Sequence, residues 1–170
     1  MKEINYLDYI KEATKGIEQG AFLTTKAGAE INTMTIGWGN IAYIWGKPIF
    51  TVLVRESRHS YQLLEDSAEF TVSIPLNNDL KKEVAFCGSK SGRDYDKFAQ
   101  SNLTAQPGNV IDVPVVGECE LHYECRVVYK SEMEETNLAA DYKDRHYSGA
   151  DENDYHTIYY GEIVSAYLTE

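Results

Sequence analysis

Two arginines stand three positions apart in the segment VLVRESRHSYQLL, residues 52–64. Arg55 and Arg58 follow an apolar run typical of a strand, and Ser57 or Ser60 could cap a helix that begins just after them. Helix N-terminal amides, hydroxyl groups and guanidinium groups all donate hydrogen bonds to anions such as phosphate. The spacing therefore indicates a phosphate site at the end of a strand. Pairing of both arginines with surface carboxylates explains the same pattern about equally well.

The charge of the whole chain makes this basic cluster informative. The 170 residues include 16 Lys and Arg against 27 Asp and Glu, which gives a formal net charge of -11. Such a chain would on average repel nucleic acid and anionic membrane surfaces, so we expect neither as a partner. No apolar run suits a signal peptide or a membrane span. We therefore expect a cytoplasmic protein, folded as a single domain over residues 1–170.

The cysteines argue for the same compartment. Cys87, Cys119 and Cys125 are an odd number without secretory context, so reduced thiols are expected. The segment CELHYEC, residues 119–125, places soft metal ligands at regular intervals. In a strand, however, Cys119 and Cys125 point to one face and His122 to the other. We therefore expect no metal site there.

The elements that must position these residues are mostly strands. Apolar spacing predicts a leading helix within residues 1–19, and Gly20 closes it. Strands are predicted at 21–25, 31–38, 49–54, 69–75, 114–129 and 156–168, and short helices within 60–67 and at 78–86, the latter capped by Asn78 or Asp79 and followed by Gly88. Residues 89–110 are predicted to be mostly loop, and the acidic stretch 131–154 to be a partner-facing or lid loop.

The strand pattern predicts the fold class. The strands are irregularly spaced, are interrupted by short helices, and do not alternate with helices as in βαβ units. This favours a mainly β (β+α) fold, a closed barrel with short helical insertions.

Three segments in order suggest a known family. INTMTIGW at 31–38, RESRHS at 55–60 and FCGSKSGRDYDKF at 86–98 resemble the FMN-binding split-barrel flavin reductases, especially their flavoredoxin-like branch. The motifs of that branch are N-T-M-T-x-x-W, R-x-S-R-x-S/T and S-G-R-x-x-D-K-F. The resemblance covers roughly residues 21–167. It implies an FMN-binding split β-barrel with noncovalent FMN, a homodimer, and electron transfer from NADH or NADPH.

The same resemblance implies a set of cofactor contacts. They are Asn32, Thr33, Met34, Thr35, Trp38, Val54, Arg55, Ser57, Arg58, Ser60, Phe86, Cys87, Gly88, Ser91 and Lys97. Without the resemblance, the strand at 31–38 would be interpreted as a core hairpin, and Lys97 as an exposed ion pair. Cys87 near a flavin invites a redox role, although a small buried filler is the commoner explanation. His59 is interpreted as a solvated loop residue.

The expected chemistry needs no catalytic side chain. GWGNIAYIWG, residues 37–46, is not a G-x-G-x-x-G motif and lies in no βαβ unit, so any nicotinamide must stack on the flavin itself. The cofactor would carry the hydride and the protein would orient it. A protein is one candidate for the physiological acceptor, which the sequence does not identify. A noncatalytic FMN-binding electron carrier or sensor, and a split barrel that holds another ligand such as haem, remain alternatives.

Overall fold

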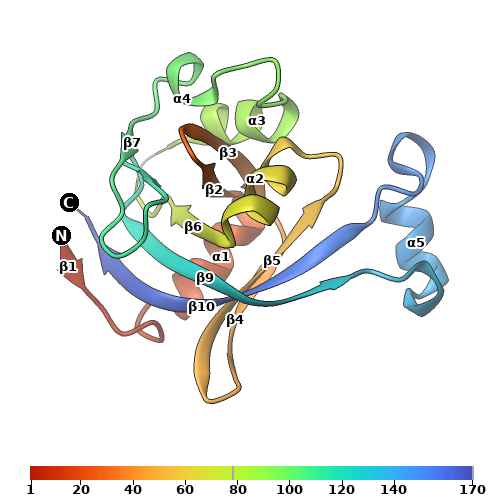
Figure 1. The fold of residues 1–170 in the computed structure, drawn as a ribbon, viewed down its shortest axis with the longest axis horizontal. Helices are drawn as coiled ribbons and strands as arrows, with labels where there is room; N and C mark the ends of the chain where they lie inside the picture. The colour runs from red at the N-terminus through yellow and green to blue at the C-terminus, as the bar shows by residue number, and fades with distance from the viewer. Residues whose placement is uncertain (78, 170) are drawn as a thin grey trace.

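Strands dominate the fold of residues 1–77 and 79–169, which a computed structural model of the chain describes (Figure 1). The strands are β1 (Lys2–Glu3), β2 (Ala21–Ala27), β3 (Glu30–Ile36), β4 (Gly39–Ile44), β5 (Lys47–Arg55), β6 (Glu69–Ile74), β7 (Ala105–Gln106), β8 (Val115–Val116), β9 (Leu121–Glu132) and β10 (His156–Leu168). The α-helices are α1 (Ile10–Gln19), α2 (His59–Ser67), α3 (Lys81–Ser89), α4 (Lys97–Gln100) and α5 (Ala140–His146), and short 3-10 helices η1 (Glu135–Asn137) and η2 (Gly149–Asp151) flank α5. Within this described part, no helix is long and apolar enough to cross a membrane.

One antiparallel sheet positions most of the chain. Its strand order is β3-β2-β6-β9-β10-β5-β4, with β1 added to β10, while β7 and β8 form a separate pair. β9 and β10 pair along most of their length, with register shifts between Tyr160 and Gly161 and between Ile163 and Ser165. Such irregularities bend and twist a strand, which helps the sheet to curl. The mainly β fold with short helices is confirmed.

The curled sheet stays open between β3 and β4. The chain passes directly from one to the other through Gly37 and Trp38, and no ladder joins the two strands in residues 1–77 and 79–169. Helix α1 packs beside this seam: a Cβ atom on Gly39 of β4 would lie 3.9 Å from the Ile17 Cδ1 atom, and one on Gly16 would lie 2.2 Å from the Ile74 Cγ2 atom. The ladder therefore does not close, unlike the closed barrel that the strand spacing predicts.

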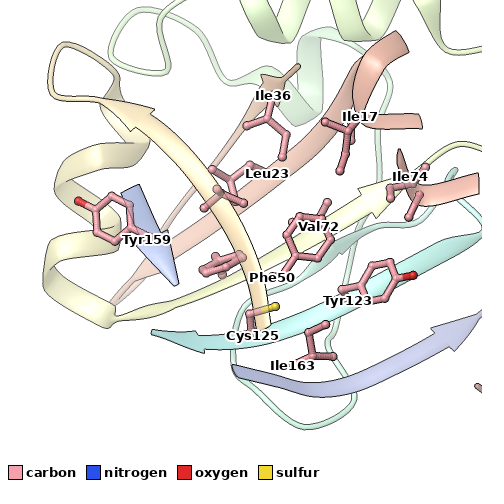
Figure 2. Packing of buried hydrophobic residues seen from close by; sticks show 14 of the residues in the cluster. Ile17, Leu23, Ile36, Phe50, Val72, Ile74, Tyr123, Cys125, Tyr159 and Ile163 are labelled. Atoms are coloured by element: carbon pink, nitrogen blue, oxygen red, sulfur yellow. The ribbon is translucent and has the colours of Figure 1, made fainter. Parts of the chain in front are cut away.

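The hydrophobic core fills the inside of the curl. Figure 2 shows Leu23, Phe50, Val72 and Tyr123 packed together from four different strands, and all four are fully buried. The next residue to Leu23 along β2, Phe22, belongs instead to a second cluster with Cys87, Leu103, Val116 and Cys119. Alternate residues of β2 therefore bury opposite faces, and the second cluster fixes α3 against the sheet.

The bounds of α3, which lies beside the site, differ from the sequence prediction. The helix predicted at 78–86 extends to Ser89, so Gly88 lies within α3 and not after it. A Cβ atom on Gly88 would lie 3.2 Å from the Thr35 Cβ atom, so glycine allows α3 to approach β3 closely. Asn78 lies outside the described residues. The N-cap position of α3 is held by Leu80 and not by Asp79 as predicted, although the Asp79 Oδ1 atom accepts a hydrogen bond from the Lys81 amide at 3.4 Å.

Other differences lie farther along the chain. The sequence pattern does not predict β4, because its residues are half-buried or exposed and lack a clear apolar face. The single strand predicted at 114–129 is divided into β8 and β9, since the chain turns where the Cys119 amide donates to the Val116 carbonyl at 3.1 Å. The predicted loop 89–110 contains the short helix α4. The predicted strand at 156–168 is confirmed at both ends as β10.

Candidate functional site

Two adjoining clefts lie where β3, β5 and the start of α2 meet. The first cleft, of about 170 Å³, is lined by Met34, Thr35, Ile36, Gly37, Trp38, Leu53, Arg55, Arg58 and His156. The second cleft, of about 120 Å³, is lined by Asn32, Met34, Ser57, Arg58, His59, Ser60, Ser89, Lys90, Ser91, Gly92 and Lys97. Because Met34 and Arg58 line both, an elongated ligand could occupy the two clefts together.

β3 supplies a wall to both clefts and fixes the helices around them. The Asn32 Nδ2 atom donates a hydrogen bond to the Ser60 Oγ atom at 2.8 Å, in the first turn of α2. The Thr35 Oγ1 atom donates to the Val84 carbonyl at 2.6 Å, in α3. Both hydrogen bonds join residues distant in sequence, so the hairpin of β2 and β3 sets where α2 and α3 stand relative to the clefts.

The second cleft is basic in an acidic protein. Arg58, Lys90 and Lys97 line it, together with four serines and the residues that begin α2, where the Tyr61 amide donates to the Arg58 carbonyl at 3.0 Å. None of the lining residues carries a carboxylate within the described part of the chain. This set of donors matches a phosphate group, which takes charged hydrogen bonds from guanidinium, ammonium, hydroxyl and helix N-terminal amide groups.

Lys97 is the most perturbed of these cations. Its side chain is 5% exposed, and the Nζ atom donates a hydrogen bond to the Cys87 carbonyl at 2.8 Å. Burial lowers the pKa of Lys97 from 10.5 to about 8, and the positive charge of Arg58 adds to the lowering. A buried ammonium group with no carboxylate partner is costly, so its place in a cleft indicates a functional role.

The loop that closes the second cleft passes very near β3. A Cβ atom on Gly92 would lie 2.1 Å from the Asn32 Oδ1 atom and 2.8 Å from the His59 Cδ2 atom. Only glycine allows this approach, which brings Ser91 into the lining of the cleft. This close approach explains why glycine occupies position 92, within the SGR sequence.

The first cleft is less charged and has aromatic groups at its rim. Met34, Ile36 and Leu53 supply apolar surface, and the backbone of residues 35–38 runs along the cleft. The Trp38 ring lies 5.0 Å from the His146 ring and 5.1 Å from the His156 ring, measured between centroids. A flat conjugated ring would find stacking surface and backbone polar groups here.

His156 is held as a neutral imidazole at this rim. It is 8% exposed, and its Nδ1 atom lies 2.7 Å from the Tyr147 hydroxyl oxygen. Burial lowers the pKa of His156 to about 4, and Arg55 lowers it further against the opposing effect of Asp154. At neutral pH the ring is therefore an uncharged hydrogen-bonding group.

The two arginines of the RESR sequence have different surroundings. The Arg58 side chain is partly exposed between the clefts, and its Nη1 atom donates to the Gly88 carbonyl at 3.2 Å. Arg55 is buried, and its guanidinium group donates to the carbonyl oxygens of Asp154 at 2.9 Å and His146 at 3.0 Å. The Arg58 guanidinium group can therefore donate hydrogen bonds into the clefts, whereas that of Arg55 is bound by His146 and Asp154.

Most of the residues predicted from the sequence converge on the clefts. Those that line one or both are Asn32, Met34, Thr35, Trp38, Arg55, Ser57, Arg58, Ser60, Ser91 and Lys97. They come from β3 and the turn after it, the segment from the end of β5 to the start of α2, the loop before α4 and the first residue of α4, so segments more than 60 residues apart in sequence meet at one place.

Five predicted residues do not line the clefts. Thr33 donates to the Leu23 carbonyl inside the β2–β3 hairpin, and Val54 is fully buried in the main core. Phe86 packs edge-on against Tyr95, with ring centroids 5.9 Å apart. The Cys87 side chain faces the second core cluster and the Ser101 hydroxyl, 3.9 Å away, so Cys87 and Gly88 reach the site only through carbonyl oxygens that accept from Lys97 and Arg58.

Other lining residues are absent from the sequence prediction. They are Ile36, Gly37, Leu53, His59, Ser89, Lys90 and His156. The neighbours of predicted residues, such as Ile36 and Lys90, could have been included from the motifs themselves. His59 begins α2 and does not lie in a loop, and its Nε2 atom lies 2.8 Å from the Glu30 Oε1 atom. His156 comes from the distant strand β10, and no local pattern points to it.

The CELHYEC segment has a structural role. His122 is fully buried, with its Nδ1 atom 3.1 Å from the Ser73 hydroxyl and its Nε2 atom 3.1 Å from the Thr169 hydroxyl. Cys119 and Cys125 lie in different core clusters.

A larger cleft, of about 810 Å³, runs along α1 on another part of the surface. Its lining mixes Glu12 and Glu120 with Lys15, and Glu120 is already bonded to the Leu76 amide at 2.7 Å. It lacks the convergence of cations, hydroxyls and a helix N-terminus that marks the two smaller clefts, which we therefore regard as the site.

Comparison with known proteins agrees with this geometry. Residues 18–170 match the family model for the flavin reductase like domain. An uncharacterized protein of Archaeoglobus fulgidus is 27% identical over 135 residues, which are 79% of this chain and 72% of that protein.

Among solved structures, flavoredoxin of Desulfovibrio vulgaris (Miyazaki F) is similar with a TM-score of 0.69 and 24% identity, covering 89% of this chain and 69% of that one. An FMN-binding protein from Thermus thermophilus with bound p-hydroxybenzaldehyde is similar with a TM-score of 0.66 and 20% identity, covering 89% and 71%. At such identities the structures show the fold alone, the split barrel, as predicted. The family model covers most of the chain, and the chain therefore belongs to the flavin reductase like domain family.

Proposed function

We propose that the chain binds FMN and passes electrons from NADH or NADPH through it to an acceptor, as a flavin reductase or flavoredoxin-type oxidoreductase. The observation that carries this proposal is the pair of adjoining clefts, one basic and rich in donors, the other less charged and with aromatic groups at its rim. Family membership supports a flavin as the ligand.

The residues present fit FMN in one orientation. The phosphate would lie in the second cleft against Arg58, Ser60, Ser91 and Lys97, where the Gly92 approach forms a close-fitting wall. The ring would lie in the first cleft along the backbone of residues 35–38. Bound FMN would supply the redox chemistry, while the chain binds, orients and partly covers it.

No separate nucleotide-binding fold accompanies these clefts. Every ladder of the sheet described here is antiparallel, and the glycine-containing segment 37–46 forms β4 and its turn to β5. A βαβ dinucleotide site requires parallel strands. We therefore propose that nicotinamide approaches the ring directly in the first cleft, and we nominate no catalytic side chain.

The partners we propose are a second copy of the chain and an electron acceptor, for which a protein is one candidate. Trp45 at the β4–β5 turn is 62% exposed and Tyr129 on β9 is 51% exposed, with ring centroids 5.9 Å apart. A patch of exposed aromatic rings suits burial between two copies. We propose a cytoplasmic location, in keeping with the free thiols of all three cysteines.

We expect the protein to purify yellow, and acid precipitation to release FMN and not FAD. The reason is that the second cleft offers donors for one terminal phosphate. The measurement is an absorption spectrum followed by chromatography of the released flavin. Colourless protein that does not take up added FMN would contradict the proposed function. Holoprotein that is reduced by dithionite but by neither nicotinamide nucleotide would instead support the electron carrier.

We expect Cys87→Ser to keep FMN and to lose less than about fivefold in the rate of flavin reduction, under ~1 kcal/mol in the barrier. The Cys87 thiol faces the core, and burial raises its pKa, so it is not the thiolate that redox chemistry needs. Serine preserves the size and the contact to Ser101. The measurement is anaerobic single-turnover reduction by NADH followed at the flavin absorbance. A variant that holds FMN but accepts no electrons would replace direct hydride transfer by a thiol mechanism.

A further inference from the structure

Arg55 is held by a segment almost a hundred residues later in the chain. Its Nη1 atom lies 3.5 Å from the Asp151 Oδ1 atom and 3.7 Å from the Asp154 Oδ2 atom, in addition to its hydrogen bonds to the carbonyl oxygens of Asp154 and His146. The guanidinium group also lies 5.1 Å above the centroid of the Tyr147 ring. A side chain with this many partners, and only 8% exposed, has little freedom to turn toward a phosphate.

The carboxylate of Asp154 forms the second half of the same contact. Its Oδ2 atom accepts from the Ser57 hydroxyl at 2.6 Å, and its Oδ1 atom accepts from the Ser57 amide at 3.4 Å. Asp154 thus binds both Arg55 and Ser57 of the RES sequence. Its carboxylate is the anion that these two side chains contact. Arg58, Ser60 and Lys97 have no carboxylate partner among the residues described.

The segment that binds Arg55 also completes the rim of the first cleft. It brings the His146 ring to Trp38 and the Tyr147 hydroxyl to His156, at the distances given above. Tyr147 is 4% exposed although it lies in a segment where almost every other side chain is accessible. Residues 140–155, which we call the rim segment, are thus fixed to the barrel mainly through Arg55, Asp154 and Tyr147. Figure 1 shows α5 of this segment at the far end of β9 and β10, away from the curl of the sheet.

We propose that Arg55 and Asp154 are positioning residues that hold the rim segment against the first cleft, and that Arg55 does not bind the phosphate. The phosphate is then bound on the Arg58 side alone. This inference rests on the proposed function, because it assigns the two arginines to different ends of one flavin. It separates two residues that the sequence motif treats alike.

The test uses the full chain with Trp45→Phe, so that Trp38 is the remaining tryptophan. Arg55→Ala and Asp154→Ala remove the two halves of the contact, Arg55→Lys is the conservative variant, and Arg126→Ala is the control. Arg126 is a half-exposed arginine that pairs with Glu69 at 3.0 Å, away from the clefts. Two measurements are made without flavin: the Trp38 emission spectrum, and the rate of trypsin cleavage after Lys143 and Arg145, both within α5. Dissociation constants for FMN and riboflavin are then measured for each variant.

We expect Arg55→Ala and Asp154→Ala to shift the Trp38 emission and to speed cleavage by about tenfold or more, as for loss of a few buried charged hydrogen bonds. Their affinities for FMN and riboflavin should fall by the same factor, because the rim lies at the ring end. Arg55→Lys should fall between, since an ammonium group cannot span both carbonyl oxygens as the guanidinium fork does. Arg126→Ala should behave like the parent.

The proposal is overturned if Arg55→Ala weakens FMN but not riboflavin while cleavage and emission stay unchanged, because Arg55 would then be a phosphate ligand. If Arg55→Ala does not fold, the same measurements on Asp154→Ala, which keeps the arginine, test the proposal. If the parent binds neither flavin, the proposed function fails, and the emission and cleavage measurements still show whether the contact holds the rim segment.

Discussion

Arg58→Ala is expected to raise the dissociation constant for FMN by about 10- to 150-fold and to change that for riboflavin by less than about threefold. Arg58 lines both clefts, and its guanidinium group donates a hydrogen bond at 3.2 Å to the Gly88 carbonyl. A hydrogen bond between charged groups contributes about 1.5–3 kcal/mol, which corresponds to the expected range. Riboflavin lacks the phosphate and so loses nothing comparable.

Flavin fluorescence quenching at fixed ionic strength measures both constants. Arg126→Ala removes the same charge from the chain at a distance, so it corrects for a general change in the field of the protein. The phosphate assignment predicts that the loss for FMN shrinks as salt is added, because screening weakens the contact in the parent protein. Equal losses for FMN and riboflavin would mean that Arg58 supports the fold through Gly88 and does not contact phosphate.

The sequence could predict the parts of this molecule that depend on neighbours along the chain. The β2–β3 hairpin, α2 directly after β5 and the strand β10 follow from apolar alternation and turn residues. The predicted cap of α2 is wrong, because Arg58 holds the N-cap position without a side-chain hydrogen bond and neither Ser57 nor Ser60 caps the helix. The same local order places Asn32, Ser60 and Ser91 in three motifs, and the fold brings all three to the second cleft.

What the sequence could not predict depends on contacts between distant segments. The motif presents Arg55 and Arg58 as equivalents, yet Arg55 is bound by carbonyl and carboxylate groups of residues 91 to 99 positions away, and no local pattern shows that pairing. His156 enters the first cleft because β10 pairs with β5 in a register that sets His156 opposite Arg55. Gly88 was expected after a helix because glycine often ends helices, but close packing on Thr35 requires it within α3.

Lys97→Met is expected to stabilise the flavin-free protein while weakening FMN by at least about tenfold through the lost charged hydrogen bond. Folding lowers the pKa of Lys97 from 10.5 to about 8, chiefly by burial, which corresponds to about 3 kcal/mol lost at neutral pH. Methionine has similar length and no charge, although it leaves the Cys87 carbonyl without its donor, at about 1 kcal/mol. The net gain of about 2 kcal/mol should raise Tm by about 4–8 °C in a chain of this size.

The difference in stability between the parent and Lys97→Met should depend on pH, because the pKa of Lys97 differs between the folded and the unfolded chain. Below pH 8 both the folded and the unfolded chain carry a protonated Lys97, so the full penalty is present. Between pH 8 and 10.5 the unfolded chain still binds the proton that the folded chain has released, so the parent gains stability relative to Lys97→Met as pH rises. The difference in unfolding free energy between parent and variant should therefore be largest at pH 7 and small by pH 10. Denaturant titrations of both proteins at the two pH values measure it.

FMN binding should favour the protonated form of Lys97, whereas folding favours the deprotonated form. A phosphate beside Lys97 favours the protonated ammonium group, so FMN binding should take up a proton near and above pH 8, and FMN affinity should fall as pH rises through that value. Riboflavin affinity in the parent, and FMN affinity in Lys97→Met, should lack this dependence. If Lys97→Met is no more stable than the parent at pH 7, and the parent binds FMN equally well at pH 7 and 9.5, then Lys97 is an ordinary structural lysine. A gain in stability accompanied by loss of FMN would show instead that its buried charge is kept for the ligand, because a side chain selected only for folding would not retain it.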